Sequence, residues 1–529
     1  MSLVAPELWP RQLRVSEQPA GPFNLAEYLL AGKDPNGLAV AHPRVTWGEL
    51  DRMVSRVAAA LTGLGLRRGD RVLLHLPNSV EFIACWLGVL RAGGVNVAAM
   101  PLLRARELSF MVDNAGARLA VGHARLWPEL GRVAEARADL ACLVAGGDVG
   151  SRAAPLERVL ADAPDRFAPV ATDAEELALI AYTSGSTGAP KGCAHCHGDV
   201  VGSIATYARR VLAPRPDDVF VGNPSMAFTY GLGVCLVFPF AAGAATTIVA
   251  EPSVDALLAT LTAARGTLLF TVPITYKTLL KMPDAELKRA TASVRLAVSA
   301  GERLSAHVYE EWVARTGIEL IEALGTTELF HIVISSRPGR VRPGATGEAV
   351  PGYVCRVVGA DFEDVAPGEP GLLAVQGPTR CRYWANEDKQ RLYVQRGWNV
   401  PGDVYVQDAD GYLWYQARND DLIVTGGYNV SPPEVEEILL RHPAIKDVGV
   451  VGKPDAFRGQ LVKAFVELAP GAAATPGLTA ELQELVKREV APYKYPREVE
   501  YMDALPRTQT GKVSRSGLRE LEQQRAGAP

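Results

Sequence analysis

The sequence predicts an α/β fold with mostly parallel sheets in a large N-terminal part, followed by a small α+β C-terminal part. Short apolar runs rich in β-branched residues alternate with helical patterns up to about residue 345, as is typical of right-handed βαβ units. Beyond that point glycine, proline, aspartate and tyrosine become frequent, and the strand patterns shorten and alternate. With 529 residues, the chain is also too long for a single core.

The expected elements follow one another in a regular order. Residues 1–45 are expected to form an N-terminal arm and an opening helix, and a second helical pattern begins at Thr46–Leu50. Arg71–Pro77 is a predicted buried strand, and Asn78 or Ser79 can cap the helix after it. Further strands of the large part are expected at Val95–Ala98, Leu119–Gly122, Val219–Gly222, Ala245–Ala250, Thr267–Val272, Val294–Ser299 and Glu319–Ala323.

Two changes in sequence pattern mark the expected domain boundaries. Short alternating strands predict a compact antiparallel β subdomain at about 345–419, within an N-terminal domain of residues 1–419. A second boundary falls at Ala417–Asp421 and begins a C-terminal domain of residues 420–529. This second domain has helical patterns at Pro433–Arg441 and Leu478–Val490, with strands expected between them.

The composition excludes several classes of protein. Lys and Arg number 55 against 59 Asp and Glu, so the net charge is -4, which argues against a nucleic-acid partner. Residues Met1–Pro10 lack the basic and apolar regions of a signal peptide. The best apolar run, Val234–Ala250, contains Pro239 and is expected to be buried core, so no membrane partner is predicted. Seven cysteines in so long a chain favour a reduced, cytoplasmic protein.

The stretch Leu177–Gly192 begins as a predicted buried strand and continues as a loop of small residues. Hydroxyl groups, glycines that admit close backbone approach and a lysine together suit a polyphosphate. The residues concerned are Thr183, Ser184, Gly185, Ser186, Thr187, Gly188 and Lys191. A Ser/Gly surface turn is the alternative interpretation. The spacing from Gly185 to Lys191 does not match a Walker A sequence, which needs G-x-x-x-x-G-K-[ST].

Further polar motifs follow predicted strands, at the edge where open α/β sheets bind ligands. Ser299–Arg303 ends one strand, and Glu322–Glu328 follows the next. In the second motif, Thr327 can hydrogen-bond a phosphate and Glu328 can hold a hard cation such as Mg²⁺. Trp398–Asp403 presents a carboxylate suited to two sugar hydroxyls. Leu505–Lys512 places a lysine on a glycine loop.

These motifs together resemble the acyl- and aryl-adenylating superfamily of acyl-CoA synthetases, luciferases and peptide-synthetase adenylation domains. The resemblance covers about residues 20–520, and five motifs occur in the family's order at about its spacing. It implies ATP, Mg²⁺ and the co-substrate coenzyme A. It also implies an N-terminal adenylation domain, residues 1–419, and a mobile C-terminal domain, residues 420–529.

The same resemblance implies a role for each motif residue. Lys512 would act in adenylation, Thr327 would contact the α-phosphate and Glu328 would bind Mg²⁺. ATP or AMP would be held by the loop residues Thr183 to Lys191 and by Glu302, Arg303, Asp403 and Arg418. Asp420 would be the hinge between the domains. Gly426, Gly427 and Tyr428 would line the pantetheine tunnel for CoA.

Within the superfamily the chain is most similar to benzoate- and 2-aminobenzoate-CoA ligases, through Ala227–Gly233, Phe330–Arg340 and Val350–Tyr353. The subgroup's aryl-pocket residues would be Thr229, Tyr230, Gly231, Ala300, Gly325 and His331. Phe228–Tyr230 and Gly192–His195 favour the 2-aminobenzoate (anthranilate) branch, since a polar Thr229 suits an ortho amino group. Benzoate is the alternative acid.

Some residues depart from the family pattern or allow another interpretation. Pro401 replaces the family's threonine before Gly402-Asp403, and Leu324 replaces a frequent tyrosine, which affects nucleotide contacts but no catalytic charge. Cys193–His197 formally matches a haem or zinc motif, but we expect neither group and interpret the cysteines as packing residues. His331 could be a satisfied core histidine, and Lys512 one more surface lysine.

Three other functions are alternatives, and the last two fit the motifs poorly. The acyl acceptor could be a carrier-protein phosphopantetheine supplied in trans, since no carrier domain is expected in this sequence. A P-loop ATPase or kinase would need the Walker spacing. A non-catalytic small-molecule binder would not need Lys512, Asp403 and Glu328. We expect a monomer or a homodimer.

Overall fold

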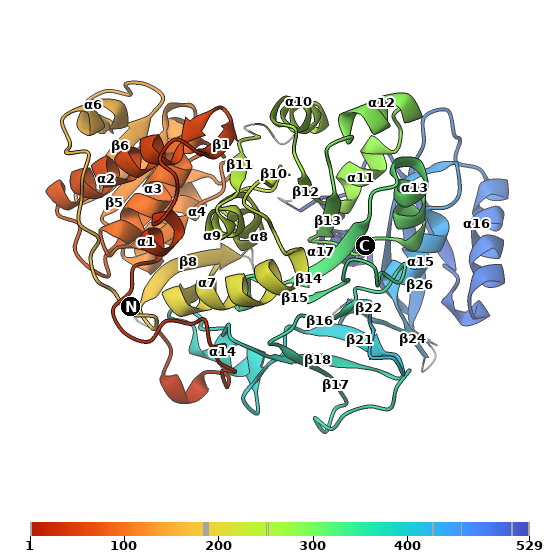
Figure 1. The fold of residues 1–529 in the computed structure, drawn as a ribbon. Helices are drawn as coiled ribbons and strands as arrows, with labels where there is room; N and C mark the ends of the chain where they lie inside the picture. The colour runs from red at the N-terminus through yellow and green to blue at the C-terminus, as the bar shows by residue number, and fades with distance from the viewer. Residues whose placement is uncertain are drawn as a thin grey trace. The chain divides into compact units, whose positions relative to one another are not determined.

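The computed structural model describes residues 3–183, 190–249, 251, 253–419, 421–425, 428–455, 458–508 and 511–526 (Figure 1). It has the predicted α/β fold, and the chain divides into two compact units. The first contains Met1–Cys355 and Ala374–Pro401, and the second contains Arg356–Leu373 and Gly402–Pro529. These compact units divide the chain at other points than residue 420, and the domain boundary expected there stays a prediction.

The first sheet of the first unit has the strand order β7-β6-β5-β3-β4-β8-β9. Neighbouring strands are parallel except for the antiparallel hairpin β8–β9. The strands are β3 (Arg71–His75), β4 (Val95–Ala98), β5 (Leu119–His123), β6 (Ala141–Ala145), β7 (Ala154–Pro155), β8 (Leu177–Thr183) and β9 (Lys191–Cys196). Parallel sheets in which both faces are covered need continuous apolar strands, and residues 72–74 of β3 are fully buried.

Helices connect these strands, and two of them begin with a side-chain cap, the second of which was predicted from the sequence. α2 (Trp47–Gly63) begins with a capping box between Thr46 and Glu49. α3 (Val80–Arg91) begins after Ser79, whose hydroxyl accepts the Phe82 N–H at 3.1 Å. Of the two predicted capping residues, Asn78 and Ser79, it is therefore Ser79 that caps the helix. The other helices beside this sheet are α4 (Ala105–Ala115), α5 (Trp127–Glu135) and α6 (Leu156–Ala161).

The second sheet of this unit has the order β16-β15-β14-β13-β12-β10-β11-β1-β2. Its strands are β1 (Leu38–His42), β2 (Val45–Thr46), β10 (Val219–Gly222), β11 (Ala245–Thr247), β12 (Leu268–Thr271), β13 (Leu296–Ala300), β14 (Leu320–Gly325), β15 (Ile332–Ser335) and β16 (Glu348–Ala349). The predicted strands are confirmed with small shifts of their ends. The prediction of an arm and a helix over residues 1–45 was incomplete, because β1 follows α1 (Leu25–Leu30) and pairs with β11.

The helices that follow β9 along the first unit are α7 (His197–Ser203), α8 (Thr229–Leu232), α9 (Phe238–Ala242), α10 (Val254–Ala264), α11 (Pro273–Leu279), α12 (Asp284–Ala290) and α13 (Ala306–Thr316). α7 continues as a π-helix over Ile204–Leu212, and another π-helical turn, Gly233–Val237, joins α8 to α9. The expectation that Val234–Ala250 is buried core holds for most of the described part of that run, because all of it except residues 241–243 is buried. No helix in the described ranges is long and apolar enough to span a membrane.

The region 345–419 is rich in antiparallel strands, as predicted: β17 (Val354–Val358), β18 (Pro370–Gln376), β19 (Val394–Gln395), β20 (Trp398–Asn399), β21 (Asp403–Gln407) and β22 (Leu413–Arg418). In the first unit, Val375 of β18 pairs with Asn399, and α14 (Glu387–Tyr393) precedes β19. In the second unit, Pro370–Leu372 pair with β21, and β21 pairs with β22.

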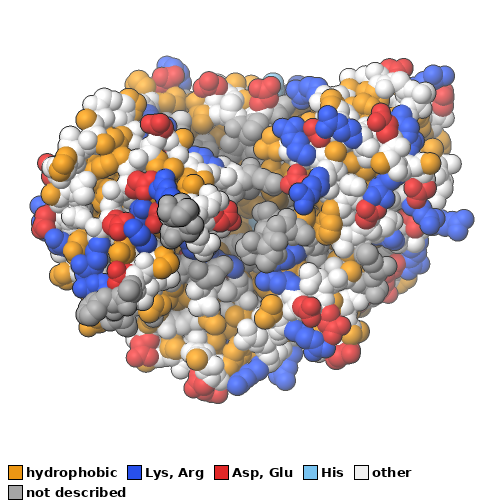
Figure 2. All heavy atoms as spheres, turned by 180° about the vertical axis from the view of Figure 1, so that it is seen from behind, with side chains coloured by type: hydrophobic (Ala, Val, Ile, Leu, Met, Phe, Trp, Pro, Cys, Tyr) orange, Lys and Arg blue, Asp and Glu red, His pale blue; other side chains and the backbone are white. Residues whose placement is uncertain are grey.

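The rest of the second unit is the predicted α+β arrangement. Its sheet has the order β24-β23-β26-β25, with β27 also paired to β26. The strands are β23 (Ile423–Thr425), β24 (Tyr428–Val430), β25 (Ile445–Asp455), β26 (Gly459–Leu468) and β27 (Glu498–Met502), and the helices are α15 (Pro432–Leu439), α16 (Pro476–Glu489) and α17 (Arg515–Ala526). Basic and acidic side chains are interspersed over the face drawn in Figure 2.

Candidate active site

The β8–β9 hairpin flanks the predicted phosphate loop. Thr183 at the end of β8 pairs with Lys191 at the start of β9, while Ser184, Gly185, Ser186, Thr187 and Gly188 lie outside the described residues. Burial and the nearby charge of Lys389 lower the pKa of Lys191, and the carboxylate of Glu328 acts in the opposite direction. The lysine that follows the loop therefore lies within electrostatic range of the Glu328 carboxylate.

The Thr-Thr-Glu motif forms a tight turn between β14 and β15. The hydroxyl of Thr326 accepts the N–H of Leu329 at 3.2 Å and caps the 3-10 turn Thr327–Leu329. Phe330 ends this turn with a left-handed φ of 67°. Gly325 is needed here, because a Cβ atom would lie only 2.6 Å from the carbonyl oxygen of His331. The turn thus presents Thr327 and Glu328 just beyond the end of a buried strand.

The Glu328 carboxylate is oriented by a tyrosine from a distant part of the chain. The hydroxyl of Tyr383 donates to Glu328 Oε1 at 2.7 Å. Burial and the charge of Glu328 raise the pKa of Tyr383 far above its ordinary value, so the phenol stays protonated and keeps donating. Tyr383 itself is held by a backbone bridge to Cys193 in β9.

The donor set at Glu328 fits Mg²⁺. A carboxylate oxygen is a hard ligand, and Mg²⁺ in nucleotide sites is commonly held by one or two carboxylates together with phosphates and waters. Among the described residues, no group of three or more His, Cys, Asp or Glu side chains could hold a metal by itself. The predicted role of Glu328 as a Mg²⁺ ligand stays a prediction.

A buried polar network lies behind this turn. Nε2 of His195 donates to the carbonyl oxygen of Thr327 at 2.7 Å, and because a carbonyl can only accept, Nε2 carries the proton. Nδ1 of His195 lies 3.9 Å from Asp199 Oδ2. Asp199 forms a fully buried ion pair with Arg382, whose guanidinium lies 5.2 Å from the centre of the Trp9 ring. His195 thereby ties β9 to the turn that carries Glu328.

The predicted aryl-pocket residues come from α8, from the ends of β13 and β14, and from His331 just before β15. His331 is buried, its Nε2 lies 3.3 Å from the carbonyl oxygen of Tyr230, and its ring lies 5.8 Å from the Tyr230 ring. Gly231 allows a close backbone contact, since a Cβ atom there would lie 2.1 Å from the Ser225 oxygen. Thr229 is buried beside them, and Ala300 ends β13. His331 is thus a hydrogen-bonded core histidine as well as a pocket candidate.

Four buried histidines should make the folded protein sensitive to acid. Burial lowers the pKa of His75, His195 and His197 to about 4 and that of His331 to about 3, from an ordinary 6.5. Below pH 6.5 the unfolded chain binds protons that the folded chain does not, so stability is full above 6.5 and falls as the pH drops towards 4. Calorimetry should show Tm falling from pH 6.5 to 5 with proton uptake on unfolding. A flat Tm over that range would contradict it.

The remaining site residues of the first unit follow β13. Glu302 and Arg303 are half-buried and come after Gly301, which has a φ of 91°. This sharp turn directs the chain away from the strand end. The contact of Glu302 and Arg303 with the adenine stays a prediction.

In the second unit, Asp403 and Arg418 lie together as the resemblance implied. They are paired residues of β21 and β22, and Nη1 of Arg418 donates to Asp403 Oδ1 at 3.3 Å. Tyr428 is 56% exposed and stacks on Tyr493 with ring centres 4.4 Å apart. Asp420, Gly426 and Gly427 lie outside the described residues.

Lys512 lies on a tight turn of the second unit. Its carbonyl oxygen accepts the N–H of Thr508 at 2.8 Å, and Gly511 has a φ of 84°. Arg507 anchors this turn, because it donates to Asp447 at 2.8 Å and to Glu467 at 3.3 Å. The turn holds the backbone of Lys512 at a defined place on this unit.

Sequence reasoning did not find Tyr383, His195 or the Asp199–Arg382 pair as parts of the site. The strand β9 was not predicted: Cys193–Cys196 belong to it, and α7 begins at His197. Cys193 and Cys196 are buried free thiols, as the packing interpretation predicted. The sequence feature that could have indicated a role for His195 in the site is its position shortly after the glycine-rich loop.

Comparison with known proteins adds to this geometry. The family model described as "AMP-binding enzyme" matches residues 31–383, and "AMP-binding enzyme C-terminal domain" matches residues 434–512. The chain belongs to the AMP-binding enzyme family. It is similar to a benzoate–CoA ligase of Thauera aromatica, with 36% identity over 478 residues that cover 90% of each chain.

Two solved structures are similar to this chain over nearly its whole length. One is an anthranilate CoA ligase in complex with anthranoyl-AMP, with a TM-score of 0.90, 30% identity and coverage of 96% of this chain and 99% of that one. The other is a benzoate CoA ligase from Burkholderia xenovorans, with a TM-score of 0.85, 32% identity and coverage of 94% and 100%. This AMP-binding enzyme is accordingly an ATP-dependent, AMP-forming acid–thiol ligase of the acyl- and aryl-CoA synthetases.

The contact between His195 and Thr327 in this AMP-binding enzyme can be tested by a matched pair of variants. His195→Leu should lower the rate of acid-dependent pyrophosphate exchange by about tenfold, because the Thr327 carbonyl loses a buried hydrogen-bond donor. His195→Gln should keep most of the rate, because its amide N–H can reach the same carbonyl. Thermal melting of both variants controls for stability. Equal impairment of the two would contradict this positioning role.

Proposed function

We propose that this enzyme activates a monocyclic aromatic carboxylate, with 2-aminobenzoate as the preferred acid and benzoate next, and transfers it to CoA. The supporting observation is the wall formed by Thr229, Tyr230 and His331. Burial depresses the pKa of His331 to about 3, so this imidazole is neutral, and its ring packs against Tyr230 and Phe238. An uncharged wall with two aromatic rings and the hydroxyls of Thr229 and Tyr230 suits an aromatic ring with a polar substituent.

The similarities favour the same class of acid. The two solved structures are named for anthranilate and benzoate, and the relative from Thauera aromatica is named for benzoate. At about a third identity these names support an aromatic carboxylate as the acid. The choice of 2-aminobenzoate rests on the Thr229 hydroxyl in the buried wall.

The first half-reaction makes a mixed anhydride. A carboxylate oxygen attacks the α-phosphorus of ATP, the bond to the β-phosphate oxygen breaks, and pyrophosphate leaves with the electron pair. Lys191 and the loop before it would hold the departing phosphates, Thr327 the α-phosphate, and Glu302 and Arg303 the adenine. Bound Mg²⁺ would supply positive charge to the phosphate oxygens, and Glu328 would hold it.

The second half-reaction makes the thioester. The CoA sulfur attacks the acyl carbon, the bond from that carbon to the bridging oxygen breaks, and AMP leaves. Asp403 and Arg418 would hold the ribose of the nucleotide, and Gly426, Gly427 and Tyr428 would line the path of the pantetheine arm. A small domain from residue 420 onward, turning about Asp420, would present Lys512 for the first step only.

Pyrophosphate exchange across a panel of acids tests the substrate. We expect the highest kcat/KM with 2-aminobenzoate, then benzoate, then hydroxybenzoates, and little exchange with a fatty acid. Highest activity with the fatty acid would overturn the aromatic assignment, and highest activity with benzoate would overturn the 2-amino preference. Competition between CoA and a phosphopantetheinylated carrier protein tests the acceptor, and we expect CoA to win.

A further inference from the structure

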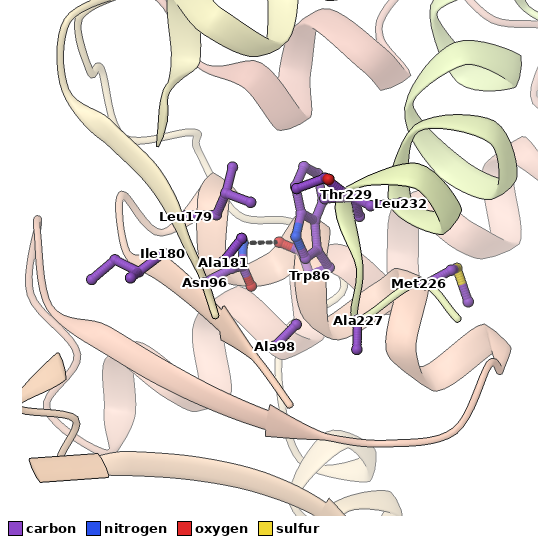
Figure 3. Close-up of a pocket in the computed structure, with 10 residues that line it drawn as sticks. All are labelled: Trp86, Asn96, Ala98, Leu179, Ile180, Ala181, Met226, Ala227, Thr229 and Leu232. Carbon is purple, nitrogen blue, oxygen red and sulfur yellow. Dashed lines mark hydrogen bonds between the residues drawn. The ribbon is translucent and has the colours of Figure 1, made fainter. Parts of the chain in front are cut away.

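A small cavity lies behind Thr229, between α3, β4, β8 and the segment that leads into α8 (Figure 3). Its volume is about 10 Å³. It is lined by Trp86, Asn96, Ala98, Leu179, Ile180, Ala181, Met226, Ala227, Thr229 and Leu232. Most of this lining is apolar, so the few polar groups on it determine what the cavity can hold.

Two of the polar groups are buried without a partner. The side-chain amide nitrogen of Asn96 donates to the main-chain carbonyl of Trp86 at 3.0 Å. Because that carbonyl can only accept, this contact fixes the amide orientation and turns Oδ1 away from it. Within the part of the chain that the structure describes, neither Asn96 Oδ1 nor Trp86 Nε1 has a hydrogen-bond partner, and both side chains are fully buried.

An unpaired acceptor and an unpaired donor on two residues that line the same cavity indicate a bound water. Buried polar groups are nearly always satisfied, and leaving one unpaired costs free energy. A cavity needs roughly 10–15 Å³ to hold a water, and such a water typically makes about three hydrogen bonds. Cavities that stay dry have no unpaired polar groups on their lining, whereas two residues that line this one carry such groups.

We propose that one water occupies this cavity and makes the aryl pocket selective for ring substituents that donate a hydrogen bond. The water accepts from Trp86 Nε1–H, donates to Asn96 Oδ1 and accepts from the hydroxyl of Thr229. The Thr229 oxygen then offers a lone pair on its other side. An amino or hydroxyl substituent of the aromatic acid can donate to it, whereas an unsubstituted ring leaves it unpaired. This inference rests on the proposed aryl-CoA ligase function.

A matched pair of tryptophan variants isolates this effect. Trp86→Phe removes the indole donor but keeps the main-chain carbonyl that holds Asn96. Trp312→Phe is the control, because Trp312 is equally buried, also has an indole nitrogen without a partner among the described residues, and lies on α13 against Tyr276 at 5.0 Å. Trp312 does not line the cavity.

The measured quantity is the ratio of kcat/KM for 2-aminobenzoate to that for benzoate. We expect Trp86→Phe to lower this ratio by about three- to tenfold, the range that one hydrogen bond supplies, and Trp312→Phe to leave it unchanged. Thr229→Val should lower the ratio at least as much, and this variant replaces Trp86→Phe as the test if Trp86→Phe does not fold. An unchanged ratio, or an equal fall in the Trp312 variant, overturns the selectivity.

A crystal structure of the wild-type protein tests the water directly. We expect electron density for one water within hydrogen-bond distance of Asn96 Oδ1 and Trp86 Nε1, and an empty cavity overturns the proposal. This result does not depend on the substrate. If the wild-type enzyme activates no aromatic acid, the proposed function fails and the selectivity fails with it, but the hydration of the cavity is decided separately.

Discussion

The Lys512→Ala variant should lose aryl-adenylate formation by about 10²- to 10³-fold and still convert supplied aryl-AMP and CoA to aryl-CoA at close to the wild-type rate. Negative charge develops on the α-phosphate and the leaving pyrophosphate only in the first half-reaction, so a lysine that stabilises it is needed only there. The turn that carries Lys512 is anchored through Arg507 to Asp447, which supports a defined position for the lysine on its unit.

A second lysine of the same unit provides the control for Lys512. Lys487 on α16 pairs with Glu484 at 2.6 Å on the surface. Lys487→Ala should change neither half-reaction, since exposed ion pairs contribute little to stability. Pyrophosphate exchange measures the first half-reaction, and thioester formation from synthetic aryl-AMP measures the second. If Lys512→Ala impairs both steps equally, the assigned role is wrong.

The Glu328→Gln variant should lower the adenylation rate by about 10²- to 10³-fold and raise the Mg²⁺ concentration needed for half-maximal rate. The amide oxygen can still accept from Tyr383, so the variant removes the charge and keeps the shape of the turn. Tyr383→Phe removes only the donor that orients the carboxylate and should cost less, about tenfold.

Binding of Mn²⁺ in the presence of ATP, followed by electron paramagnetic resonance, provides a readout that is independent of turnover. Glu328→Gln should weaken this binding, and Tyr383→Phe should weaken it less. Glu311→Gln is the control, because Glu311 lies on α13 and pairs with Arg315 at 3.2 Å. Unchanged Mn²⁺ binding in Glu328→Gln would show that this carboxylate is not a metal ligand.

Local sequence patterns predicted most of the fold. Strands such as Val219–Gly222 are short apolar runs between turn residues, and that pattern depends on the strand's own residues. β9 was missed because Lys191–Cys196 contains glycine, histidine and two cysteines, which do not form a strand-like pattern. This strand is stabilised by a segment that is distant in the sequence, since the N–H of Ala194 donates to the carbonyl oxygen of Arg382 at 2.8 Å.

The site residues also differ in whether neighbouring residues in the sequence are enough to predict them. Motif residues such as Thr327 and Glu328 could be named from the sequence because family motifs are contiguous. The residues that hold them could not, because His195 lies 132 positions from Thr327 and Tyr383 lies 55 positions from Glu328. Asn96 and Trp86 are further examples, because their unpaired atoms become apparent only in the packed structure.

The central claim is that an aromatic carboxylate reacts at the α-phosphorus of ATP before it reaches CoA. The most direct measurement uses 2-aminobenzoate labelled with heavy oxygen in its carboxylate, with ATP and CoA, and locates the label by mass spectrometry. The anhydride breaks at the acyl carbon, so the account predicts one labelled oxygen in AMP and none in pyrophosphate. Label in inorganic phosphate, with ADP as the nucleotide product, would contradict it.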